Sequence, residues 1–144
     1  MIGPFNPSLL NPSIATAFLI LQAAEEQHTS LDERVRQVVI LTVGAVWQAP
    51  YELYAHSAVA RHAGLSDAAV AALVAGHLPS ELTMEQKTAY LLTQALSTSH
   101  RLDDDVYRLA EKTLGAAGVF ELTMLVGIYH TVCAILNVFD IPAP

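Results

Sequence analysis

The chain has 144 residues, 53% hydrophobic and 15% charged, which is enough for one hydrophobic core but not two. Its fourteen acidic and seven scattered basic residues give a net charge of −7, which argues against nucleic acid or an anionic membrane as a partner. The apolar excess predicts a homo-oligomer that buries helix faces between subunits.

The single cysteine, Cys133, has no partner in the chain for a disulfide or a Cys-x-x-Cys centre. The N-terminal residues lack the basic and apolar segments of a secretory signal, so we expect a cytoplasmic protein. Residues 122–139 form a long uncharged apolar run. Polar residues interrupt this run and basic flanks are missing, which favours a buried core helix over a membrane span.

Prolines at the beginning of the chain separate an arm from a first helix. Pro4, Pro7 and Pro12 prevent one continuous helix, so residues 1–11 are predicted to be extended. Asn11 and Pro12 have the pattern of an N-cap followed by the first helical position. A helix is therefore expected from there to about residue 27.

A capping box at Ser30 and Glu33 predicts a second helix that runs to about residue 47. The segment 38–46 is apolar on nearly every side, which indicates a central helix covered all round. Pro50 and Gly64 match the first position and the C-terminal cap of the helix that follows.

A short helix is predicted to begin at Ser66 and to stop at Gly76. Thr83 and Gln86 form a second capping box, and the helix that they begin is expected to reach about residue 98.

The aspartates 103–105 are favourable at a helix N-terminus, and Gly115 is expected to end that helix. The last helix is predicted over 119–138. Because no strand pattern occurs between these segments, the prediction is one all-α domain of about seven helices over residues 1–144.

Glu52 and His56 have the spacing that could support chemistry. They lie four residues apart on one predicted helix, so their side chains share a face and can share a proton. The carboxylate is expected to raise the pKa of the imidazole, and partial burial to raise that of the carboxyl. The pair could act as general acid and base, or be an ordinary solvated pair.

Several segments resemble the carboxymuconolactone decarboxylase family, within the AhpD-like helical superfamily. They are the stretches 36–41 (RQVVIL), 51–56 (YELYAH) and 60–66 (ARHAGLS), and the tail from 127 to 142 is similar to the closing helix of that family. The resemblance implies an AhpD-like helical fold. It also implies assembly as a homotrimer or homohexamer.

The redox branch of this superfamily carries Cys-x-x-Cys-x-x-x-His on the helix that matches 50–63. When its histidine is set on His56, Ala49 and Glu52 occupy the two cysteine positions. The resemblance therefore implies no thiol peroxidase activity. Gln37 takes the place of a relay glutamate, and an amide can form hydrogen bonds but cannot accept a proton.

The decarboxylase branch also lacks the cysteine pair, and similarity to it implies acid/base chemistry on a small organic acid or lactone. His56 would be the acid that protonates carbon after loss of CO₂. Glu52 would set the charge of His56, and Gln37 would support it through hydrogen bonds.

Tyr51 and Trp47 are candidates to contact the substrate, although aromatic residues near a helix junction are often core residues. Arg61 is the nearest cation for a substrate carboxylate. His62 follows His56 by six residues, a poor spacing for shared metal ligation, and neither a metal nor another cofactor is expected.

The alternative to an enzyme is a non-catalytic oligomeric scaffold or a small-ligand-binding protein that kept the fold. The substitution of a relay glutamate by Gln37 favours it. Catalysis requires Glu52 and His56 to face one accessible pocket, whereas the alternative predicts that neighbouring side chains cover them.

Overall fold

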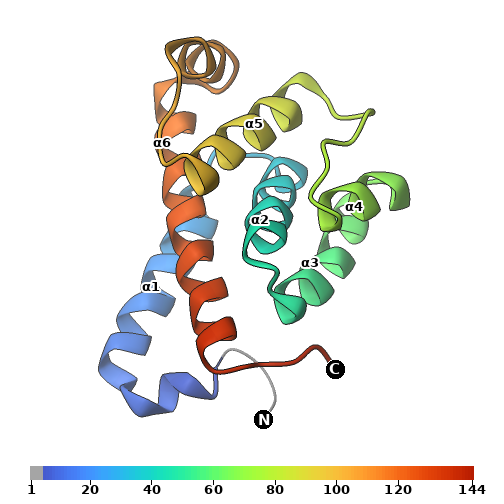
Figure 1. The fold of residues 1–144 in the computed structure, drawn as a ribbon. Coiled ribbons are helices and arrows are strands. Elements are labelled where there is room, and N and C mark those ends of the chain that lie inside the picture. The colour runs from blue at the N-terminus through green and yellow to red at the C-terminus, as the bar shows by residue number, and fades with distance from the viewer. Residues whose placement is uncertain (1–4) are drawn as a thin grey trace.

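Helices are the regular elements of residues 5–144, the part of the chain that the computed structural model describes, and no strand occurs there. The all-α prediction is confirmed. Figure 1 shows the arrangement. The elements are the 3₁₀ helix η1 (Pro7–Leu10) and the α-helices α1 (Pro12–His28), α2 (Glu33–Trp47), α3 (Pro50–Ala63), α4 (Asp67–Val74), α5 (Met84–Thr98) and α6 (Asp104–Val138).

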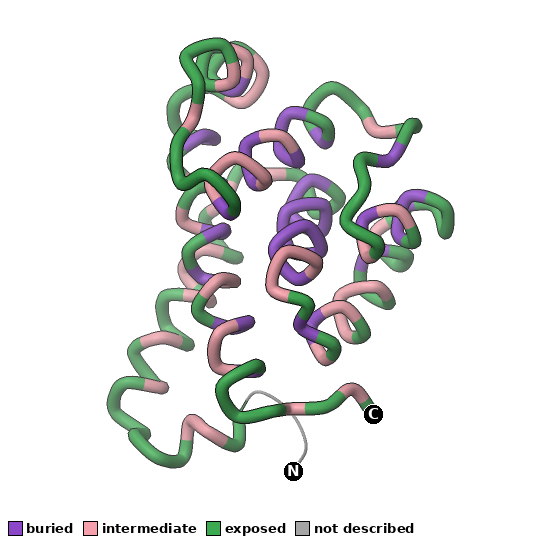
Figure 2. Tube along the Cα trace, in the orientation of Figure 1, coloured by how far each residue is buried: buried purple, intermediate pink, exposed green. Residues whose placement is uncertain are grey.

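Helix α2 is the centre of the fold, as its apolar sequence predicts. Every residue from 35 to 44 is buried, and α3, α4, α5 and α6 all pack against this helix. Figure 2 shows the continuous buried stretch of α2, surrounded by helices that are buried on one side only. A helix that is apolar on all sides is stable in water only when neighbours cover it on all sides. Two polar residues of α2, Arg36 and Gln37, are therefore buried as well.

The segment η1–α1 lies along α6 at one side of the molecule (Figure 1), and none of its residues is buried as a whole, although the Glu25 side chain is only 7% exposed. The predicted extended arm is wrong for Pro7–Leu10, which form a 3₁₀ helix. Pro7 occupies the first helical position, where its fixed φ suits a helical turn as well as an extended chain. Residues 1–4, also predicted to be extended, lie outside the described residues.

The predicted capping box at Ser30 is wrong, because α2 begins later and Asp32 caps it by accepting the Arg34 N–H. Ser30 instead donates its N–H and its hydroxyl to Glu121 of α6, both at 2.8 Å. These hydrogen bonds fix the α1–α2 connection and lower the pKa of the Glu121 carboxyl.

The other caps agree with the sequence. Asn11 and Ser66 cap their helices, and Gly64 ends α3 in the left-handed conformation. The capping box of Thr83 with Gln86 is present at the start of α5.

Helix α6 is long and apolar enough to cross a membrane by length and composition. Gly115 interrupts it with non-helical φ and ψ of 73° and 165°, and the two parts correspond to the two helices predicted there. The longer part packs against α2 and α5 through buried Leu122, Leu125 and Val126. These contacts place one face of the helix in the core of the domain, and 33% of its most apolar stretch is buried.

Gly115→Ala is expected to lower the free energy of unfolding by about 1–3 kcal/mol, because this backbone region is accessible essentially to glycine alone. Space is not the cause, since an added Cβ would meet no heavy atom within 4 Å. The control is Gly127→Ala, which is equally unobstructed but lies in regular helix and should gain up to about 1 kcal/mol. Urea unfolding of both variants checks this, and equal effects would contradict it.

Candidate acid/base site

The first turn of α3 positions Glu52 against the core. Pro50 is the first residue of α3, and the next turn brings His56 onto the same face as Glu52. His56 Nε2 lies 3.1 Å from Glu52 Oε1, and the two side chains are 19% and 4% exposed. The contact lacks the alignment of a hydrogen bond, so Glu52 Oε1 is a buried oxygen with no hydrogen-bond partner among the described residues.

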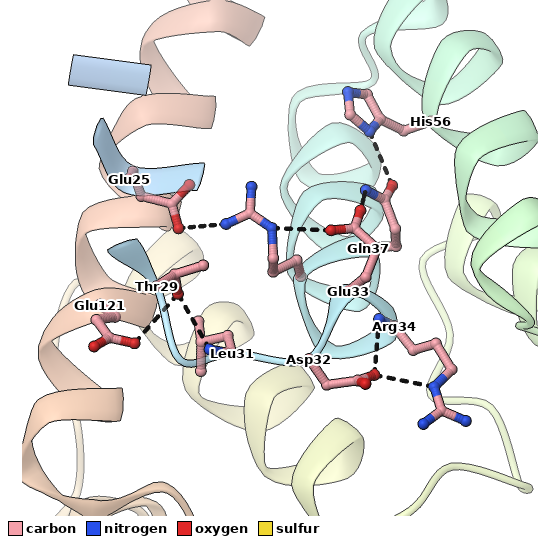
Figure 3. Close-up of polar contacts among 10 residues, drawn as sticks. Glu25, Thr29, Leu31, Asp32, Glu33, Arg34, Gln37, His56 and Glu121 are labelled. Atoms are coloured by element: carbon pink, nitrogen blue, oxygen red, sulfur yellow. Dashed lines mark hydrogen bonds and ion pairs between the residues drawn. The ribbon is translucent and has the colours of Figure 1, made fainter. Parts of the chain in front are cut away.

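Gln37 holds the other side of the imidazole. The Nδ1 atom of His56 lies 2.9 Å from Gln37 Oε1, and the Gln37 amide donates to Glu33 Oε1 at 2.7 Å (Figure 3). A carboxylate can only accept, which fixes the orientation of the Gln37 amide and leaves its oxygen to accept from Nδ1–H. Neutral His56 therefore carries its proton on Nδ1, and its Nε2 lone pair is on the side of Glu52.

The polar chain continues to α1. Arg36 Nε lies 3.3 Å from Glu33 Oε2, and Arg36 Nη1 lies 2.5 Å from Glu25 Oε1. The side chains of Arg36 and Glu25 are 8% and 7% exposed, so this is a buried ion pair between α2 and α1. Neither residue was a site candidate in the sequence. Arg36 and Gln37 are adjacent polar residues at the start of an otherwise apolar helix, and this pattern could have indicated a buried polar cluster.

The protonation states differ from those predicted. Burial raises the pKa of Glu52 to about 7. Burial, together with the positive charge of Arg36, lowers the pKa of His56 to about 4, where the sequence predicted a raised value. The prediction counted the neighbouring carboxylate but not the loss of solvent or Arg36. Near neutral pH, Glu52 is thus the group of the pair that titrates, and His56 is neutral.

Glu52 and His56 line a common cavity of about 280 Å³ between α1, α3 and α6. Tyr51, a predicted substrate contact, lines it as well. The lining residues are Phe5, Ser8, Ala15, Phe18, Leu19, Gln22, Tyr51, Glu52, Ala55, His56, Tyr129, Val132 and Ile135.

The other two predicted substrate contacts lie outside this cavity. The Trp47 ring packs edge-on against His130, with 5.8 Å between ring centroids, and its carbonyl accepts the Asn137 amide. Arg61 is on the surface, where its Nε lies 2.7 Å from Asp67 Oδ1. Arg61 follows His56 by five residues, which on a helix corresponds to a rotation of about 140° around the axis. The two side chains therefore lie on different faces of α3, although they are close in sequence.

Tyr129 of α6 is a cavity residue that sequence reasoning did not select. Its ring stands edge-on to the His56 imidazole, with 5.3 Å between centroids. Burial and the negative charge of Glu52 raise the pKa of the phenol, so its hydroxyl stays protonated and can donate. Its contact with His56 crosses 73 residues of sequence, and no local pattern reveals it.

Two further residue groups bear on the chemistry. Cys133 is free and buried, and burial raises its thiol pKa, which disfavours the reactive thiolate. Within residues 5–144, no group of three or more His, Cys, Asp or Glu side chains is arranged to hold a metal ion.

These features define a class of protein: an all-α domain with a buried glutamate–histidine pair at the wall of a cavity. The chain belongs to the carboxymuconolactone decarboxylase family, whose sequence profile matches residues 12–95.

A solved structure shows the same fold. It is that of a protein of unknown function from Agrobacterium tumefaciens, for which an antioxidant defence role as an AhpD protein has been suggested. The two chains share 17% identity, the match covers 96% of each, and the TM-score is 0.87. No curated protein matches the sequence.

Proposed function

We propose that this protein is an acid/base enzyme that moves a proton to and from carbon in a small lactone or organic acid. The observation that carries the proposal is the buried Glu52 Oε1, which has no hydrogen-bond partner among residues 5–144 and lies 3.1 Å from His56 Nε2 at the wall of a cavity. A buried carboxyl with a pKa near 7 can accept and return a proton at neutral pH. An unsatisfied buried oxygen is costly unless a ligand uses it.

In the proposed reaction, the Glu52 carboxylate removes a proton from a carbon next to a carbonyl group. The electron pair of the broken C–H bond moves to the carbonyl oxygen, and the Tyr129 phenol can donate a hydrogen bond to that oxygen. Protonated Glu52 then returns the proton to carbon. Neutral His56, held by Gln37, keeps an uncharged nitrogen lone pair 3.1 Å from Glu52 Oε1, which favours the protonated form of Glu52 over its carboxylate.

Decarboxylation would use the same last step. The C–C bond to the carboxylate breaks, CO₂ leaves with the electron pair remaining on the substrate, and an acid protonates the carbon. The pKa order of the pair supports Glu52 as this acid, in place of His56. His56 then has the role of partner, and Gln37 that of positioning residue.

Two other expectations remain part of the proposal. We place the protein in the cytoplasm, and we infer that it assembles as a homotrimer or homohexamer. Large apolar side chains on η1, α1 and α6 support assembly, because they are more than half exposed in the isolated chain: Leu9, Leu10, Ile14, Ile20 and Phe120.

The proposal is tested with α-angelica lactone, an uncharged five-membered lactone whose ring CH₂ lies between a carbonyl and a double bond. In D₂O buffer at about pH 8, the protein is expected to accelerate exchange of these hydrogens over buffer alone, as measured by proton NMR. Cys133→Ala is expected to retain the acceleration, since the thiol takes no part.

A panel of small lactones and organic acids is screened in parallel for binding by saturation-transfer NMR. Compounds that bind the cavity but undergo neither exchange nor CO₂ loss above the buffer rate would refute catalysis. That result would instead support the ligand-binding alternative.

A further inference from the structure

We propose that the cavity selects an uncharged, largely apolar carbonyl compound and disfavours ligands that carry a carboxylate. This inference deepens the proposed function by naming the substrate class of the same site. It departs from the carboxylated substrate that the name of the family describes.

Much of the cavity lining is apolar. It includes Phe18 and Leu19 of α1 and Val132 and Ile135 of α6. Such a surface gains free energy when it covers apolar ligand atoms. The cavity, at about 280 Å³, is also large enough for a compound of about ten non-hydrogen atoms.

The cavity offers no cation to an anionic ligand. None of the described residues that line the cavity is Lys or Arg. The buried cation of this region, Arg36, already pairs with Glu25 and Glu33. Two carboxylates therefore compensate its single charge, and it has no excess positive charge to attract a third.

Glu52 itself disfavours an anionic ligand. Once it ionises, its carboxylate lies at the cavity wall with an oxygen that has no hydrogen-bond partner in the described part of the chain. A ligand carboxylate beside it would bring two negative charges together where little solvent screens them, and such an arrangement is disfavoured. The polar groups that remain, among them Gln22, are neutral and suit a carbonyl or a hydroxyl group.

The inference also selects between the two reactions of the proposed function. An organic acid about to lose CO₂ enters as a carboxylate, whereas a neutral lactone or ketone does not. The favoured reaction therefore relocates a proton. One C–H bond breaks as Glu52 takes the proton, the electron pair shifts through the enolate, and a new C–H bond forms, with no change in oxidation state.

The experiment compares two compounds of nearly equal shape, uncharged acetophenone and the benzoate anion, by NMR titration. At about pH 8, acetophenone is expected to bind at least about tenfold more tightly than benzoate. At about pH 6, where Glu52 is mostly protonated, the ratio should fall, because benzoate stays ionised while the repulsion decreases. Equal binding, a preference for benzoate or binding of neither compound would overturn the inference.

Gln22→Arg provides a gain-of-binding test, since it adds a cation at the cavity wall. Benzoate is expected to bind at least about tenfold more tightly to this variant than to the unmodified protein. The matched control is Gln27→Arg, which makes the same change at an exposed residue of α1 outside the cavity lining and should leave both affinities unchanged. Equal changes in benzoate affinity for the two variants would contradict binding of the ligand in this cavity.

Binding is measured here without turnover, so the two proposals can fail separately. Selective binding of acetophenone with no exchange of lactone hydrogens would support the proposed selectivity and refute the proposed acid/base activity. Catalysed exchange with no preference between the two compounds would support the activity and refute the selectivity.

Discussion

Replacement of Glu52 by glutamine is expected to slow lactone hydrogen exchange by about 10²–10⁴-fold, the usual contribution of a general acid or base. The amide keeps the size of the side chain and, like the protonated carboxyl, carries no charge beside His56 Nε2, which lies 3.1 Å from the carboxyl oxygen. What the variant loses is the ability to accept a proton. The measurement is the exchange rate by NMR at saturating lactone.

The pH dependence distinguishes this role from a structural one. In the unmodified protein, the rate should rise as Glu52 ionises through its pKa of about 7, and the variant should lose this rise. The control is Glu85→Gln, an exposed carboxylate that also lies in the first turn of its helix and should leave rate and profile unchanged. A Glu52→Gln variant with full activity would refute the assignment.

Stability should change in the direction opposite to activity. The folded-state pKa of Glu52 is raised, so the unmodified protein has its full stability from this group below about pH 4.5 and loses it as pH rises through about 7. Glutamine cannot ionise and avoids this loss. Glu52→Gln is therefore expected to be more stable than the unmodified protein at about pH 8, by on the order of 2 kcal/mol in urea unfolding.

Arg36→Met is expected to lower the free energy of unfolding by about 3–5 kcal/mol, because it leaves the buried carboxylate of Glu25 without its partner. For a domain of this size the melting temperature should fall by roughly 10 °C. The matched control is Arg34→Met, which breaks an ion pair with Asp32 whose two side chains are about half exposed and should cost less than about 1 kcal/mol.

The double variant Glu25→Gln with Arg36→Met should recover part of the lost stability, since it removes both charges. Arg36→Met should also raise the pKa of His56, because the positive charge of Arg36 is one cause of its low value. Titration of the His56 ring signals by NMR measures this. Equal costs for the variants at Arg36 and Arg34, or an unchanged His56 pKa, would contradict the role given to the buried pair.

Local signals were sufficient for most of the helix boundaries. Pro12, Pro50 and the capping box at Thr83 act within one helical turn, so their effects can be read without a tertiary structure. The box at Ser30 is absent because Glu121, 91 residues away, accepts the Ser30 N–H that Glu33 would accept in a capping box, and it also accepts the Ser30 hydroxyl.

The candidate site likewise has features that follow from local sequence and features that depend on distant residues. The sequence by itself determined that Glu52 and His56 share a helix face and that no cysteine pair accompanies them, since helical periodicity and composition are local properties. Only the tertiary structure decided which of the two titrates near neutral pH. A pKa depends on burial and on charges brought close in space, and Arg36 and Tyr129 reach the pair from other helices.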